Sequence, residues 1–219
     1  MCGRFALYSP YPKLARCIGV PLTRVEQELP ARYNVAPGTW IIGVRRPAAD
    51  EPAVMDALRW GFKPHWAGES APEPINATVE KVAMSRYFKG AFSHHRCLIP
   101  ADGWYEWQPQ AGGKQPYFFC RQDREPLWLA GIWAQRADGS PGCAILTEPA
   151  RGFTQDIHPR MPLVLDNDSL ETWLDPDLTD RETIRHRVRH LPIDMLTHWA
   201  VSKRVGPPQN EGEGLIEPV

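Results

Sequence analysis

Residues 97–147 read CLIPADGWYEWQPQAGGKQPYFFCRQDREPLWLAGIWAQRADGSPGCAILT, and this stretch decides the expected fold. Runs rich in aromatic and aliphatic residues alternate in it with clusters of Gly, Pro and Asp, a pattern typical of strands joined by turns. The predicted strands are Cys97–Pro100, Gly103–Gln108, Tyr117–Arg121, Leu127–Ala134 and Cys143–Thr147.

Outside this stretch the pattern changes to short elements and loops. Helices are predicted at Pro12–Ile18, from a cap at Thr78, at Ser169–Leu174 and at Asp180–His190; strands are predicted at Trp40–Val44 and Ala53–Trp60, and turns at 32–38. The tail from Pro207 is polar and rich in Gly and Pro, so we expect it to fray. Strands in the middle with helices around them indicate a single α+β domain over residues 1–219.

The composition excludes several classes of protein. Of the 219 residues 42% are hydrophobic and 23% charged, as in globular proteins, so a mainly disordered or fibrous chain is ruled out. The 23 prolines and 17 glycines argue against a helical bundle. Without a long apolar run or a signal peptide, we expect no membrane insertion and a cytoplasmic location, nucleoid-associated when bound to DNA.

The five cysteines are odd in number, scattered and without a Cys-x-x-Cys pair, so neither a disulfide framework nor a four-cysteine zinc site is expected. The four cysteines other than Cys2 are predicted to be small core residues. His94, His95 and Cys97 are close in sequence, but neighbours on a strand point to opposite faces. We therefore predict no metal and no cofactor.

Cys2 is the most informative single residue. Removal of an initiator methionine would leave its thiol beside a free α-amine, with unperturbed pKa values of about 8.5 and about 8. Such a 1,2-aminothiol captures aldehydes as a five-membered thiazolidine ring. Gly3 gives the backbone freedom for close approach to a ligand, and Arg4 adds a cation. Taken alone, Cys2 could also be an accidental second-position cysteine.

Three further segments carry candidate groups. On a strand, Trp104 and Glu106 share one face, so Glu106 is either desolvated between aromatic residues, with a raised pKa, or exposed at a sheet edge. His158, between Ile157 and Pro159, is either a rigidly mounted proton carrier or a surface histidine. Asn76 could orient a substrate or hold the terminal amine, or it could cap a helix.

Taken together, several motifs resemble the SOS-response-associated peptidase family of abasic-site-processing proteins. The set is specific because the motifs occur in a fixed order and because the first of them includes Cys2. They are Met1–Cys2–Gly3–Arg4–Phe5, Arg32–Tyr33–Asn34–Val35–Ala36–Pro37, Trp60–Gly61–Phe62 through Trp66, Asn76–Ala77, residues 96–107 (RCLIPADGWYEW) and His158–Pro159–Arg160–Met161–Pro162.

The resemblance implies a single α+β domain with strongly twisted, barrel-like β-sheets and short helices, acting as a monomer on single-stranded DNA that contains an abasic site. It implies that Cys2 forms a covalent thiazolidine with the opened deoxyribose. Asn76 and Glu106 would surround the amine of Cys2, and His158 would carry protons. The implied DNA-binding residues are Arg4, Asn34, Trp66, Arg86 and Arg160, with Trp40 a less secure member of the groove.

Two positions depart from the family pattern. Thr78 stands where an arginine is usual, which removes one expected phosphate contact, and Phe62–Lys63 replaces a more usual aliphatic pair. Two other functions remain open from the sequence. One is a conventional cysteine peptidase with Cys2 as nucleophile and His158 as base, in which loss of Met1 could be autocatalytic. The other is a non-covalent module that only binds single-stranded DNA.

Overall fold

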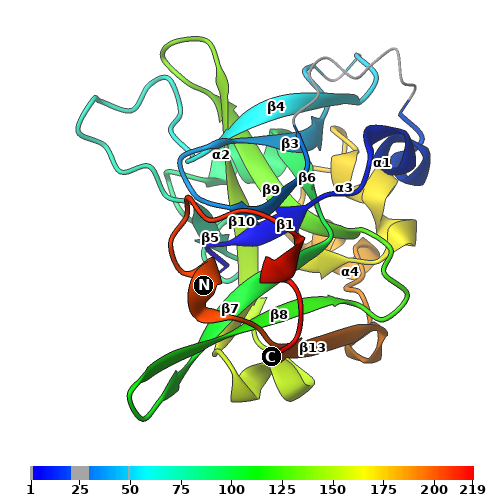
Figure 1. The fold of residues 1–219 in the computed structure, drawn as a ribbon. Helices are drawn as coiled ribbons and strands as arrows, with labels where there is room; N and C mark the ends of the chain where they lie inside the picture. Colours follow the sequence, from blue (N-terminus) through cyan, green and yellow to red (C-terminus); the bar gives the residue numbers. More distant parts are fainter. Residues whose placement is uncertain (1, 21–29, 49) are drawn as a thin grey trace.

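The computed structural model describes residues 2–20, 30–48 and 50–219 (Figure 1). Its strands, in chain order, are β1 (Phe5–Leu7), β2 (Arg32–Val35), β3 (Trp40–Arg45), β4 (Val54–Trp60), β5 (Asn76–Thr78), β6 (Arg96–Ala101), β7 (Gly103–Gln110), β8 (Gly113–Arg121), β9 (Leu127–Gln135), β10 (Pro141–Pro149), β11 (Arg160–Pro162), β12 (Val164–Leu165) and β13 (Leu196–Ala200). The α-helices are α1 (Tyr11–Ile18), α2 (Lys89–His94), α3 (Leu170–Leu174) and α4 (Arg181–Arg187).

The strands form two sheets. One contains β13, β8, β7, β1 and β2 in that order, built around the β7–β8 hairpin. In the other, β10, β4, β3, β6 and β9 are neighbours, and β9 also pairs with β10, so these five strands close into a barrel. β5 and β11 extend it from β10, and β12 from β9. The predicted α+β domain with barrel-like sheets is confirmed.

Alternating side chains of the barrel strands divide between two buried clusters. Leu98 on β6 belongs to one cluster, while its neighbours Cys97 and Ile99 belong to the other. This second cluster, here called the Cys2 cluster, also contains Cys2 and, from the first sheet, Trp104. One face of the barrel strands therefore points to the Cys2 cluster, because strand side chains alternate. There the barrel packs against the sheet that carries β1 and β7, around the beginning of the chain.

The short helices gather beside the strands, with α1, α3 and α4 on one side in Figure 1. Arg96, buried beneath them, donates through Nε to the carbonyl of Trp173 at 2.7 Å and through Nη1 to that of Phe92 at 2.8 Å. It therefore satisfies carbonyls near the ends of α2 and α3. No helix of the described residues is long and apolar enough to cross a membrane.

The predicted helix after Thr78 is wrong. Asn76–Thr78 is a strand paired in parallel with residues 145–147 of β10, and the amide of Val79 still donates to Thr147 O at 3.0 Å. Isolated turns follow, and the next helix begins at Lys89. Pairing with β10 thus places Thr78 in a strand instead of at a helix cap, and the residues after it form turns.

Other differences concern element ends. The last α-helix ends at Arg187 and not at the predicted His190, because Val188 is extended (φ −94°, ψ 123°) and buried. The turns predicted over 32–38 contain β2, and Cys17 is exposed, whereas Cys97, Cys120 and Cys143 are buried as predicted.

The C-terminal tail is packed rather than frayed. Leu215 is buried against the outer face of the five-stranded sheet, in a cluster with Tyr105 and Phe118. A β-bridge joins Val201 to Pro218, and the amide of Tyr33 donates to Glu211 at 2.8 Å. A polar composition therefore did not imply a loose end here.

Candidate active site

The pairing of β1 with β7 brings the beginning of the chain to Glu106. Phe5 lies opposite Trp104, and the amide of Tyr105 donates to Arg4 O at 3.0 Å. Continued by two residues from Phe5, this antiparallel register places Gly3 opposite Glu106. A strand of three residues is thus sufficient to deliver Cys2 to this carboxylate.

Cys2 is fully buried in the cluster that bears its name. Burial raises the pKa of the Cys2 thiol, and the nearby Glu106 carboxylate raises it further. The side chain is therefore a neutral thiol at neutral pH, and it must lose its proton to a neighbouring base when it reacts.

Glu106 is 4% exposed, so the desolvated alternative from the sequence is the one observed. Burial raises the pKa of its carboxyl from 4.5 to about 7. A carboxyl that titrates near neutrality can both accept and return a proton, as general acid–base chemistry requires.

His158 lies beside Glu106, with Nδ1 3.9 Å from Oε2 of the carboxylate. Both the carbonyl oxygen of Arg160, at 2.9 Å, and its amide nitrogen, at 3.0 Å, flank the same Nδ1. The amide donates to the neutral ring, and the carbonyl accepts from the protonated ring, so each protonation state has a partner. Burial lowers the pKa of His158 and so favours the neutral ring, while the hydrogen bond with the backbone of Arg160 opposes this shift.

Asn76 lies on β5, directly after Ile75, which packs against the Cys2 cluster. Its Nδ2 donates to Ile145 O at 3.3 Å, which fixes the amide plane against β10. Its Oδ1 is buried and has no hydrogen-bond partner among the described residues. A buried acceptor without a partner is costly, so this oxygen is suited to receive an N–H group from a reacting amine.

Asp102 is a positioning residue that was not among the predicted site residues. It is buried, and its carboxylate accepts from the amides of Tyr8 and Ser9 at 2.6 and 2.7 Å. These bonds hold the end of β1 against β7, and thereby the chain that leads to Cys2. Its signals in the sequence were its place between two predicted strands, which also suits an ordinary turn, and its position within the motif at residues 96–107.

Two of the predicted DNA-binding residues hold the C-terminal tail in this structure. Asn34 is fully buried and donates through Nδ2 to Pro207 O at 3.0 Å and Asn210 O at 2.8 Å. Arg4 Nη1 donates to Asn34 Oδ1 at 2.7 Å and to Val205 O at 2.9 Å. With the tail in this place Asn34 has no surface for DNA, and its DNA contact stays a prediction.

Arg160 is also engaged within the protein. Its guanidinium forms a bidentate pair with Glu80, at 2.6 and 3.0 Å, and donates to Thr147 O. The hydrogen bonds from Arg160 lower the pKa of Glu80. A carboxylate thus occupies the fork of donors that a DNA phosphate would use.

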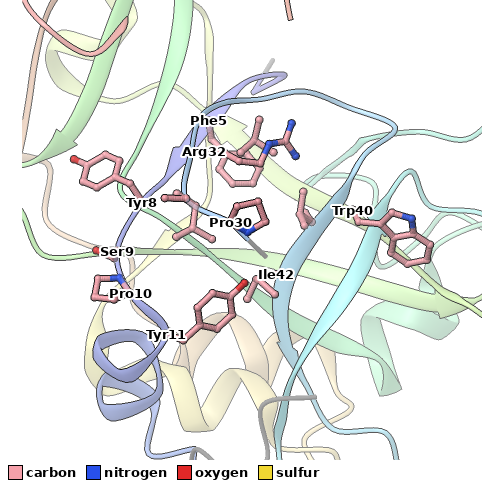
Figure 2. A pocket seen from close by; sticks show the side chains of 13 residues that line it. Phe5, Tyr8, Ser9, Pro10, Tyr11, Pro30, Arg32, Trp40 and Ile42 are labelled. Carbon is pink, nitrogen blue, oxygen red and sulfur yellow. The ribbon is translucent and has the colours of Figure 1, made fainter. Parts of the chain in front are cut away.

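Trp66 and Arg86 line one hollow, whereas Trp40 lies elsewhere. Trp66 is 60% exposed and contacts Tyr87 edge-on at 5.6 Å between ring centroids. Trp40 lines a separate cavity of about 280 Å³ between β1 and β3, together with Phe5 (Figure 2). The structure therefore does not place Trp40 beside Trp66.

A family model and relatives of known name match this chain over nearly its whole length. The model described as SOS response associated peptidase (SRAP) covers residues 1–208. The chain belongs to the SRAP family. The Abasic site processing protein YedK of Escherichia coli (strain K12) is 34% identical over 226 residues, covering 100% of both chains. YoqW of Bacillus subtilis (strain 168), also named an abasic site processing protein, is 30% identical over 99% of both chains.

A solved structure supports the same fold for this SRAP chain. A phage-related protein from Bordetella bronchiseptica superposes with a TM-score of 0.76 at 31% identity, over 93% of this chain and 95% of that one. The two departures from the family pattern are local. Thr78 is the last residue of β5, and Lys63 donates to Glu69 O at 2.6 Å and pairs with Glu73 at 3.5 Å. Lys63 is therefore engaged within its own loop.

Proposed function

We propose that this protein captures abasic sites in single-stranded DNA by forming a thiazolidine between Cys2, exposed as the N-terminal residue by removal of Met1, and the lesion aldehyde. The crosslink shields the lesion. The observation that carries the proposal is the burial of Cys2 beside Glu106, whose carboxyl titrates near neutral pH. The names of the full-length relatives point to the same substrate. We further propose that the protein acts as a cytoplasmic monomer.

The reaction moves protons at every step and loses one water. The closed sugar first opens to its aldehyde, with Glu106 or His158 moving the hydroxyl proton. The neutral amine of Cys2 then adds to the aldehyde carbon, and loss of water from the carbinolamine gives an imine. Finally the sulfur adds to the imine carbon while the thiol proton passes to a base and the imine nitrogen gains a proton. Reversal runs through the same steps.

The site fits this route better than conventional cysteine proteolysis. A peptidase needs a thiolate, and its cysteine has a lowered pKa beside a histidine. Here burial and Glu106 both raise the pKa of Cys2, and His158 is bracketed by the backbone of Arg160. In thiazolidine formation the amine attacks first, so a neutral thiol is suitable.

Incubation of the Met1-free protein with single-stranded DNA containing one abasic site is expected to give a product that survives denaturation. Its intact mass should equal the sum of the protein and DNA masses less one water, because imine formation is the only step that releases a molecule. Denaturing electrophoresis and mass spectrometry together measure this product.

Matched substrates separate the alternatives. DNA whose abasic aldehyde has been reduced to an alcohol, and undamaged DNA, should bind without crosslinking. Protein acetylated at its N-terminus should also bind without crosslinking. Equal crosslinking by acetylated protein would rule out the aminothiol reaction. Binding of all substrates with no covalent product from Met1-free protein would favour the non-covalent binding module.

Replacing Glu80 with Gln is expected to strengthen binding to undamaged single strands by about 2- to 5-fold. The change removes the carboxylate that competes with phosphate for Arg160, and an exposed ion pair of this kind is worth about 0–1 kcal/mol. The salt dependence should steepen by about 0.7 in log–log slope, one additional phosphate contact on a single strand. Fluorescence anisotropy across a salt series measures both.

Glu171→Gln is the control, because it removes one exposed carboxylate on α3, which pairs with Arg46. It should leave affinity unchanged. Weaker binding by Glu80→Gln would mean that Glu80 instead holds Arg160 in the orientation that DNA needs.

A further inference from the structure

A pocket of about 400 Å³ lies beside α4, against the face of β10 that points away from the Cys2 cluster. Leu146 of β10 lines this pocket, whereas the preceding Ile145 belongs to the Cys2 cluster. None of the four candidate catalytic residues is among its lining residues. We call it the α4 pocket, and it is a separate site from the candidate active site.

The wall of the α4 pocket is apolar. Eight of its twelve lining residues are Val, Leu, Ile, Phe or Trp, and six of these eight are aliphatic. The one polar atom in these eight side chains, Nε1 of Trp173, already donates to Cys97 O at 2.8 Å. A polar ligand would lose its hydrogen bonds to water here, with no side chain of the wall to replace them. The wall therefore favours a hydrocarbon chain.

Two arginines of the lining are available to an anion. Arg181 and Arg185 lie four residues apart on α4, and both line the pocket. Their ion pairs with Glu182 are 3.8 and 3.7 Å long, beyond hydrogen-bond distance, and lie in solvent, so they are weak. An anionic head group can bind both guanidinium groups with little to displace.

The other charged or titratable side chains of the lining are already engaged. Glu80, the single acid among the described lining residues, accepts from Arg160 with both carboxylate oxygens. Nδ1 of His190 lies 2.8 Å from the buried carboxylate of Glu148. The free charge at the pocket is therefore positive, although the whole chain has a net charge of −1.

We propose that the α4 pocket binds a single-chain alkyl carboxylate, with the carboxylate at Arg181 and Arg185 and the chain against Phe92, Trp173 and the aliphatic wall. A mostly apolar cavity of this volume, with a few polar groups that fix orientation, is typical of small-molecule sites. At the packing density of a protein interior, it accommodates a chain of about 8 to 12 carbons. The site needs no DNA.

The test is a titration of the full-length protein with octanoate, decanoate and octanol, each below the concentration at which it forms micelles. Calorimetry measures affinity, and the methyl resonances of Leu146, Leu163 and Ile184 report where the ligand binds. Decanoate should bind about 15-fold more tightly than octanoate, because it buries two more methylene groups. Octanol should bind about 10-fold more weakly than octanoate, because it cannot form charge-assisted bonds with the arginines.

Three substitutions test the assignment of the two ends. Arg181→Gln and Arg185→Gln should each weaken decanoate binding by about 10-fold and leave octanol binding unchanged. Arg187→Gln is the matched control, since it removes an exposed charge of α4 outside the lining. Val188→Phe should abolish binding of both compounds by filling the pocket. The arginine variants alter no buried side chain, so they decide the question even where Val188→Phe does not fold.

Three outcomes would overturn the proposal. They are octanol binding as tightly as octanoate, equal effects of Arg185→Gln and Arg187→Gln on decanoate binding, and unchanged methyl resonances at millimolar decanoate. Because none of these measurements contains DNA or uses Cys2, they leave the proposed function untouched whichever way they fall.

Discussion

Cys2→Ala is expected to abolish the denaturation-resistant product with abasic DNA while leaving binding to undamaged DNA within about 2-fold. Without sulfur the N-terminal amine can reach only the imine, which hydrolyses when the protein unfolds. The measurement is denaturing electrophoresis of Met1-free proteins at equal occupancy of DNA. Retention of a stable product by the Ala variant would show that the bond forms elsewhere.

Cys2→Ser and Cys17→Ala provide the matched comparisons. The Ser variant keeps the amine and nearly the same shape, so it should give an imine that becomes stable only when reduced with borohydride. Cys17 is an exposed free thiol on α1, and its removal should change nothing. Loss of product in the Cys17 variant would show that a second thiol takes part.

Glu106→Gln is expected to slow crosslinking by about 10²–10⁴-fold, the contribution of a positioned acid or base, with little change in affinity for undamaged DNA. The amide keeps the shape of the side chain and cannot exchange protons at neutral pH. Single-turnover crosslinking, beside equilibrium binding to intact DNA, measures the two effects separately. A parallel loss of rate and affinity would make Glu106 a binding residue.

The pH profile gives a second measure of the role of Glu106. As a base it must be ionised, so the wild-type rate should rise with pH through the pKa of about 7. The Gln variant should keep only the rise that comes from the amine, whose unperturbed pKa is about 8. Identical profiles for the two proteins would exclude Glu106 as the base.

Folding stability should change with pH in the opposite direction. Because burial raises the pKa of Glu106, the folded state holds its proton more tightly than the unfolded state, and stability falls as pH rises from about 4.5 to about 7. At about 1.4 kcal/mol per unit this loss is about 3 kcal/mol by pH 8. Glu106→Gln should therefore be stabilised relative to wild type at pH 8 but not at pH 4, as thermal unfolding at both values would show.

Strand periodicity and turn residues were sufficient for the main elements, and the order of the motifs was sufficient for the family. Period-two alternation places Trp104 and Glu106 on the face of β7 toward the Cys2 cluster. It places Tyr105 on the opposite face, in the cluster that contains Leu215. The aminothiol follows from the side chain and α-amine of Cys2 alone. Both inferences depend only on neighbours in sequence and on functional groups.

Contacts between distant residues decided the rest. The burial that raises the pKa of Glu106 comes from packing of the sheet on the barrel, and pairing with β10 placed Thr78 in a strand where the sequence predicted a helix cap. The pair of Arg160 with Glu80 joins residues 80 positions apart, and the bond of Asn34 to Asn210 spans 176. Sequence alone determined which groups this protein has for its chemistry; only the tertiary structure determined their protonation and their availability to DNA, because both depend on the neighbours that folding supplies.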